Sequence, residues 1–305
     1  MVFLIGLTYH YSLACSQSIN QSSQLIQQSV EQSAQQLVQQ LAKQPIRQYL
    51  GDGEIYVETK YFNMIVPGWD ILLTPAILTS LAWEPTLSNY LKERIKPGMI
   101  TFDIGANMGW FSCLFASCGA LVHAFEPNPR LQQILRKNIF LNAGRATNKC
   151  AVNQCAVSDN EGVVPMRFPH WLVGGASLHN YDQTSWLDSL IDEDINTDVV
   201  TLDAYAKKMN IEKVDLIKID IEGFEEHALR GAADIISRSP GLILSIEFTR
   251  GQYSNSFPNW LFERFSEAYL PAFNRAIDLK FLLEYEAKTV LPEYSHIDIV
   301  FHARK

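Results

Sequence analysis

The chain has 305 residues, of which 47% are hydrophobic, and this length suits one sizeable α/β domain with additions or two small domains. Its 25 Lys and Arg residues are outnumbered by 33 Asp and Glu residues, which gives a formal net charge of −8. Binding to a phosphate backbone depends on a basic surface, so this composition argues against a nucleic-acid partner.

The five cysteines form no C-x-x-C pair and have no histidines at zinc-binding spacing. An odd number of cysteines in a chain of this length is typical of free thiols in a reducing compartment, so we expect a cytoplasmic protein without a cysteine-built metal site. The apolar residues 1–15 are shorter than the ~20 residues that cross a bilayer and lack the basic start of a secretory signal. No membrane span is therefore expected.

Residues 1–50 form an N-terminal extension that begins apolar and becomes rich in Gln and Ser. Within residues 16–44, apolar side chains recur at helical spacing and predict an amphipathic helix (Ile26, Val30, Leu37, Val38 and Leu41). This helix could pair with a second copy as a coiled coil, which would allow self-association, or it could pack on the chain's own surface.

Residues 51–96 lead into the main domain. Alternating apolar and turn residues predict a small hairpin there, followed by a helix over residues 84–94 whose first turn accepts a proline. The main domain is expected over residues 97–305, with an irregular insertion at 163–200 that would cover the substrate. Four ring-bearing side chains of this insertion could line an acceptor pocket: Trp171, His179, Tyr181 and Trp186.

The main domain opens with an apolar strand, a glycine-bearing turn and a helix, the arrangement that forms a cofactor cleft in open α/β sheets. The turn has the spacing G-x-x-x-G at Gly105 and Gly109, with Asn107 between them, and lacks the G-x-G-x-x-G of a dinucleotide site. Asp103 precedes this turn, where it would repel a pyrophosphate and favour a cationic ligand. Alternatively, Asp103 caps the helix that follows.

The second strand ends at Glu126, about 20 residues after the first turn, the spacing at which an acidic side chain binds ribose hydroxyls. A ligand with a ribose, a positive centre and no phosphate indicates S-adenosylmethionine. Alternatively, Glu126 only precedes a proline turn. A third strand is expected over residues 150–157, and its end would bring the backbone of Ala156 and Val157 to the adenine, together with Asp159.

The fourth strand of the main domain is a largely apolar run over residues 214–219, which also contains Asp215 and Lys218. Asp220 and Glu222 follow at its carboxyl end. If the strand order reverses between this strand and the first, Lys218, Asp220 and Glu222 lie beside the transferred methyl group, and Asp220 also serves the cofactor. We assign the general base to Asp220 or Glu222, because a desolvated carboxyl beside a like charge has a raised pKa.

Other roles for these polar residues stay open. His227 is the next candidate for the base, although a helix histidine is more often at the surface or in packing. Glu225 and Glu226 could simply complement a helix dipole. Asp220, Glu222 and Glu247 could instead hold a divalent cation, since magnesium and calcium prefer oxygen ligands.

The C-terminal part of the chain completes the expected sheet. Its pattern predicts helices over residues 225–237 and 259–269, and strands over residues 241–248, 281–285 and 296–301.

Several motifs resemble the signature of the FkbM-family methyltransferases, class I enzymes that use S-adenosylmethionine. They are residues 102–109 (FDIGANMG), 125–127 (FEP), 202–203 (LD), 218–225 (KIDIEGFE) and 229–231 (LRG), with a similar lead-in at 67–70 (PGWD), 83–85 (WEP) and 96–98 (KPG). The resemblance covers about residue 53 onward. It implies a Rossmann-like, doubly wound, mostly parallel sheet of seven strands with helices on both faces. It also implies O-methylation of a hydroxyl on a sugar, a polyketide or a related small molecule.

Two other classes of function remain open. A nicotinamide-dependent oxidoreductase is disfavoured by the missing G-x-G-x-x-G and by Asp103, and it would bind a dinucleotide. A non-catalytic scaffold would keep the fold, self-associate through residues 16–44 and bind no cofactor.

Overall fold

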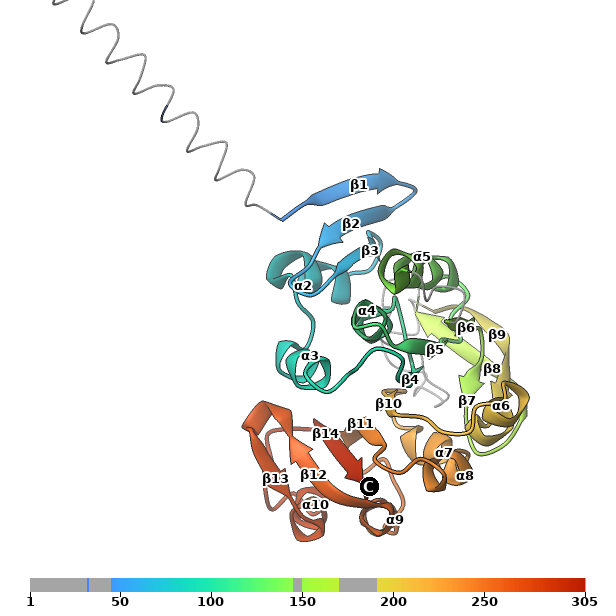
Figure 1. Cartoon of the computed structure of the whole chain (residues 1–305), viewed down its shortest axis with the longest axis vertical. Helices are drawn as coiled ribbons and strands as arrows, with labels where there is room; N and C mark the ends of the chain where they lie inside the picture. Colours follow the sequence, from blue (N-terminus) through green and yellow to red (C-terminus); the bar gives the residue numbers. More distant parts are fainter. Residues whose placement is uncertain (1–31, 33–44, 145–149, 170–190, 305) are drawn as a thin grey trace, which may run out of the picture. The chain divides into compact units, whose positions relative to one another are not determined.

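The computed structural model describes residue 32 and residues 45–144, 150–169 and 191–304. The chain divides into two units, Met1–Ile46 and Arg47–Lys305, and the second unit contains nearly everything that the structure describes (Figure 1). Apart from residue 32, the predicted helix over residues 16–44 lies outside the described residues, so self-association through it stays a prediction. Within the described ranges, no helix has the length and apolar character that a membrane crossing requires.

The main sheet has eight strands within the described residues, in the order β13-β12-β14-β11-β10-β4-β5-β6. The parallel strands are β4 (Ile100–Ile104), β5 (Leu121–Phe125), β6 (Ala151–Asn153), β10 (Leu216–Ile219) and β11 (Ile243–Thr249). The antiparallel strands are β14 (His296–Ala303), β12 (Phe265–Leu270) and β13 (Arg275–Ile277). The α/β class is therefore confirmed. The expected number of seven strands is wrong, because eight strands of the described residues form the sheet, which is mixed and has its three antiparallel strands at one edge.

Strand order reverses at β4, which is the condition under which Lys218, Asp220 and Glu222 lie near the turn after β4. The chain builds β5 and β6 on one side of β4 and then returns to place β10 on its other side. The carboxyl ends of β4, β5 and β10 therefore meet at one edge of the sheet, where parallel sheets form their ligand sites.

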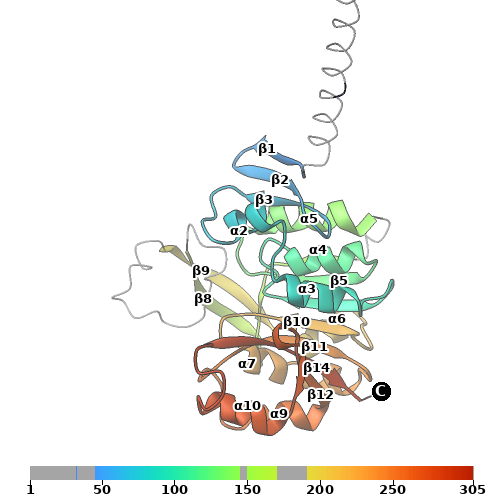
Figure 2. The same ribbon diagram turned by 90° about the vertical axis from the view of Figure 1, so that its left-hand side faces the viewer.

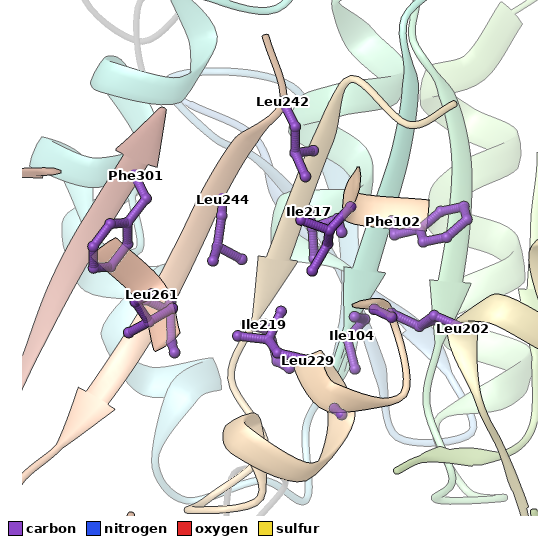
Figure 3. Close-up of a cluster of buried hydrophobic side chains, with 14 of the residues drawn as sticks. Phe102, Ile104, Leu202, Ile217, Ile219, Leu229, Leu242, Leu244, Leu261 and Phe301 are labelled. Atoms are coloured by element: carbon purple, nitrogen blue, oxygen red, sulfur yellow. The ribbon is translucent and has the colours of Figure 1, made fainter. Parts of the chain in front are cut away.

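Helices cover both faces of this sheet. One apolar cluster contains α6 (Leu202–Lys208), α7 (Glu225–Arg230), α8 (Ala233–Ser237), α9 (Phe257–Arg264) and α10 (Leu279–Glu286). The other contains α2 (Leu73–Ser80), α3 (Pro85–Lys92), α4 (Trp110–Ser117) and α5 (Gln132–Ala143). Figure 3 shows Ile217 and Ile219 of β10 in the first cluster. Side chains alternate along a strand, so Lys218 points to the opposite face, toward α4.

In the part of the chain that the structure describes, two smaller sheets flank the main one. The antiparallel strands β1 (Arg47–Gly51), β2 (Glu54–Glu58) and β3 (Asn63–Pro67) include the expected lead-in hairpin. Strands β7 (Ala156–Val157), β9 (Ile191–Val200) and β8 (Gly162–Pro169) form the other sheet, and Figure 2 shows β8 and β9 to one side of the main sheet. The four cysteines in the described residues are free thiols.

Four predicted elements need correction. The strand expected over 150–157 is divided between two sheets, because β6 pairs with β5 and β7 pairs with β9. Residues 281–285 belong to helix α10, whose N-cap Asp278 accepts a hydrogen bond from the amide of Phe281 at 2.8 Å. The helix expected over 259–269 ends at Arg264, and the chain continues as β12. The helix expected over 225–237 breaks at Gly231, where a Cβ would lie 2.2 Å from the carbonyl oxygen of Ser158.

The turns after β4 and β10 touch at Gly105, which yields a prediction with a matched control. A Cβ on Gly105 would lie 2.0 Å from the carbonyl oxygen of Asp220, whereas a Cβ on Gly251 would meet nothing within 4 Å, and both glycines have φ +77°. Left-handed strain alone costs about 1 kcal/mol, and overpacking adds about 1–3 kcal/mol. We expect Gly105→Ala to lower the free energy of unfolding by about 2–4 kcal/mol and Gly251→Ala by only about 1 kcal/mol. Denaturant unfolding measures both values, and equal losses would contradict the contact.

Candidate active site

A cavity of about 220 Å³ lies at the edge where β4, β5 and β10 end. Nine of the ten site residues predicted from the sequence line it: Asp103, Gly105, Asn107, Glu126, Ala156, Val157, Lys218, Asp220 and Glu222. Gly109 is outside the lining. Its φ is +97°, and a Cβ there would lie 2.7 Å from Leu135 Cδ1, so the structure places this glycine in the packing of α4 against α5. The predicted cluster is therefore brought together almost whole.

Glu126 ties the turn after β4 to the end of β5. Its Oε2 accepts a hydrogen bond from the amide of Asn107 and its Oε1 accepts one from the amide of Asn128, both at 2.8 Å. The side chain is buried, and burial raises the pKa of Glu126 to about 7. Each carboxylate oxygen keeps a further lone pair, so Glu126 can still accept hydrogen bonds from a ligand.

Asp103 is a buried carboxyl on the same sheet face as Lys218. The two residues are neighbours in the β4–β10 register. The hydroxyl of Ser112, in the first turn of α4, donates a hydrogen bond to Asp103 Oδ2 at 2.5 Å. Burial raises the pKa of Asp103, although this hydrogen bond and the charge of Lys218 oppose the shift.

Lys218 and Asp220 form an ion pair inside the cavity wall. Lys218 Nζ donates to Asp220 Oδ2 at 2.8 Å and lies 5.0 Å from the ring centroid of Phe111. Only 3% of Lys218 is exposed. Burial acts against both charges, but their mutual attraction outweighs it, so the pKa of Lys218 is raised and the pKa of Asp220 is lowered. Asp220 is therefore held ionised.

Further carboxyl groups surround this ion pair and have raised pKa values. Burial is the main cause in each case, and it raises the pKa of Glu222 to about 7, of Glu84 to about 8, of Glu247 to about 9 and of Asp298 to about 6. The negative charge of Asp220 adds to all four shifts. Such groups take up and release protons near neutral pH, which suits acid–base work.

Hydrogen bonds to the side chain of Glu225 fix the turn that carries Asp220 and Glu222. Glu225 Oε1 accepts hydrogen bonds from the amides of Ile221 at 2.8 Å and Gly223 at 3.3 Å, and Glu225 Oε2 accepts one from the hydroxyl of Tyr253 at 2.8 Å. Glu222 has a left-handed φ of 56°. Glu225, predicted only as a possible dipole partner, is thus a supporting residue of the site.

Other predicted side chains lie apart from the cavity lining. His227 and Asp159 pair with each other, with Nδ1 and Oδ2 3.0 Å apart, and neither residue lines the cavity. In the part of the chain that the structure describes, no group of three or more His, Cys, Asp and Glu side chains is arranged to hold a metal ion. Trp171, His179, Tyr181 and Trp186 lie outside the described residues.

Sequence reasoning missed the contribution of the lead-in segment and of β8. Trp83, Glu84, Leu72, Leu73 and Met166 line the cavity and were not among the predicted site residues. Glu84 precedes β4 by many residues, so no strand-end pattern points to it. The available signal was the W-E-P stretch, because Glu is not among the preferred N-cap residues and here directly precedes a helix-starting proline.

Comparison with known families identifies the chain. The family model described as the methyltransferase FkbM domain matches residues 103–274, which is more than half of the chain. The match begins at Asp103, at the end of β4, and includes β5, β10 and β11, which position the site together with β4. The chain belongs to the FkbM methyltransferase domain family, as the sequence motifs predict.

Curated relatives are similar to part of the chain. The 31-O-demethyl-FK506 methyltransferase FkbM of Streptomyces tacrolimicus is 36% identical over 176 residues, 48% of this chain and 64% of that protein. The methyltransferase sdnD of Sordaria araneosa is 27% identical over 154 residues, 42% of this chain and 58% of that protein. The chain thus spans less than two thirds of the length of these relatives. A solved tRNA (uracil-54, C5)-methyltransferase of Pyrococcus abyssi aligns with 84% of this chain and 45% of that chain at 13% identity, with a TM-score of 0.43, too distant to carry an argument.

The raised pKa of Glu247 predicts how stability depends on pH. The folded state holds this proton more tightly than the unfolded state, so the stabilisation is full below the ordinary pKa of 4.5 and is lost as pH rises through about 9. Glu247→Gln should therefore lose less stability than the wild type between pH 5 and pH 9. Between pH 5 and pH 9, the melting temperature of the wild type should therefore fall by several degrees more than that of Glu247→Gln, since about 1 kcal/mol corresponds to about 2–4 °C for a protein of this size.

The exposed Glu263→Gln, whose side chain is 70% exposed, is the control and should follow the wild type. Parallel melting curves for Glu247→Gln and wild type across this pH range would contradict the assignment.

Proposed function

We propose that the protein binds S-adenosylmethionine in the cavity and methylates a hydroxyl group of a sugar, a polyketide or another small molecule. The observation that carries this proposal is that the two ends of the cavity have different polar groups. Glu126 lies at the β5 end, and the Lys218–Asp220 pair with its surrounding carboxyls lies at the β10 end. Family membership supports methyl transfer, and the geometry supports the assignment of the two ends.

The residues at the β4 and β5 ends suit the nucleoside and amino acid parts of the cofactor. Glu126 offers free lone pairs to ribose hydroxyls, because its present partners are two backbone amides. The backbone at Gly105 and Asn107 would border the amino acid part, with Asp103 behind it. Ala156 and Val157 give an apolar wall for the adenine, and both are buried.

The residues at the β10 end suit the transfer step. S-adenosylmethionine supplies an electrophilic methyl group on a sulfonium ion. The carboxyls around Lys218 favour a cation, and positioning of the acceptor oxygen supplies much of the rate. Glu222 accepts the hydroxyl proton as the methyl group passes to oxygen, because its pKa of about 7 suits a general base. Asp220, which is held ionised by Lys218, orients the site and does not take the proton.

The cofactor assignment is tested by calorimetric titration of the purified chain with S-adenosylhomocysteine and, separately, with NAD. We expect binding of S-adenosylhomocysteine and none of NAD. Glu126→Gln should weaken that binding about 10- to 100-fold, because a charge-assisted hydrogen bond contributes about 1.5–3 kcal/mol. Binding of NAD alone would indicate an oxidoreductase, and binding of neither would indicate a scaffold.

The assignment of the base is tested with labelled S-adenosylmethionine and a panel of hydroxylated sugars and polyketides. For an acceptor found in this way, Glu222→Gln should lower kcat about 100- to 10,000-fold, the usual contribution of a general base. The affinity for S-adenosylhomocysteine should stay within a factor of two. If kcat of Glu222→Gln is unchanged, Glu222 is not the general base and another carboxyl has this role.

A further inference from the structure

Glu84 has an unusual backbone conformation for its position. It is the N-cap of α3, directly before Pro85, with φ 41° and ψ 60° in the left-handed region. A non-glycine residue in this region costs of order 1 kcal/mol, and such strain gathers at functional sites. The carbonyl oxygen of Glu84 accepts the first hydrogen bond of the helix, from the amide of Ser88 at 2.8 Å.

The segment around Glu84 is fixed to the main domain by a short chain of hydrogen bonds. The indole nitrogen of Trp110, at the start of α4, donates to Ser88 Oγ at 2.9 Å, and Ser88 Oγ donates to the carbonyl oxygen of Trp83 at 2.8 Å. Ser88 is fully buried. The backbone of residues 83–88 is therefore held in place, and the strained conformation of Glu84 is part of a rigid arrangement.

The carboxyl group of Glu84 has an unused acceptor. Its Oε2 atom is buried and has no hydrogen-bond partner among the described residues. A buried acceptor without a partner costs about 1–3 kcal/mol. Glu84 also lines the cavity, so its carboxyl group borders the space that a ligand would occupy.

Glu84 belongs to the methyl end of the cavity. The charges that act on it are those of Lys218, Asp298 and Asp220, all on or directly after β10 and β14, whereas Glu126 stands at the end of β5. Burial keeps the pKa of Glu84 near 8, so both its protonated and its ionised forms are available at neutral pH. The cofactor's nucleoside is assigned to the other end, which leaves this space to the acceptor.

We propose that Glu84 is an acceptor-binding residue, whose Oε2 atom accepts a hydrogen bond from an O–H or N–H group that the acceptor presents at the methyl end of the cavity. This inference rests on the proposed function, because the position of the cofactor in the cavity comes from that proposal. The acceptor must then carry a hydrogen-bond donor at this place. A molecule that presents only an ether or ketone oxygen to Glu84 is rejected, because these oxygens cannot donate a hydrogen bond.

The test compares two cofactor analogues that differ only near the transferred methyl group. Sinefungin carries an amine where S-adenosylmethionine carries the methyl group, and so presents N–H donors toward the acceptor space, whereas S-adenosylhomocysteine presents none. In calorimetric titrations of the full chain, we expect the wild type to bind sinefungin at least tenfold more tightly than S-adenosylhomocysteine. Glu84→Gln should reduce that preference at least fivefold and leave the affinity for S-adenosylhomocysteine within a factor of two.

Two further variants keep the test decisive. Glu93→Gln, one residue beyond α3 and with its side chain 76% exposed, should keep the wild-type preference. Glu84→Asp keeps the charge but shortens the side chain, so it should also lose the preference if contact with Oε2 is the cause. An unchanged preference in both Glu84 variants would overturn the role of Glu84, whereas failure of the wild type to bind S-adenosylhomocysteine would overturn the proposed function itself.

Discussion

The buried charge of Lys218 organises the β10 end of the cavity. An ammonium group in a protein interior needs nearby compensation, and here Asp220 supplies it directly at 2.8 Å. Carboxyls from distant parts of the chain gather around the pair: Glu84 from the lead-in, Glu247 from β11 and Asp298 from β14. Since one lysine cannot hold all of them ionised, protons remain in the cluster near neutral pH. A site built in this way favours a cation and has groups ready to take a proton.

The opposite end of the cavity depends on backbone contacts. Gly105 lets the turn after β4 touch the turn after β10, because any Cβ there would overlap the carbonyl oxygen of Asp220. Glu126 then fixes the same turn to β5 through the amide of Asn107. The two turns and the strand end are thus joined before any ligand arrives. This rigidity reduces the ordering that binding would otherwise require.

Much of this arrangement can be predicted from the sequence, and the failures have physical causes. Asp103, Glu126 and Asp220 each stand at the end of an apolar run, and parallel strands bring such ends together. Residues 281–285 were misread because a short apolar run fits a strand or a helix equally well, and the N-cap at Asp278 decided for the helix. Glu84 was missed because its electrostatic interaction with Lys218 arises only in the folded chain, and the W-E-P stretch alone does not show which residues it will face.

The central claim is that the cofactor lies with its ribose at Glu126 and its reacting end beside Lys218 and Asp220. A crystal structure of the chain with S-adenosylhomocysteine tests it most directly. The account predicts ribose hydroxyls within hydrogen-bond distance of the Glu126 carboxylate, the adenine against Ala156 and the sulfur facing the Asp220 turn. A ligand bound outside this cavity, or bound with its ribose at the β10 end, would contradict it.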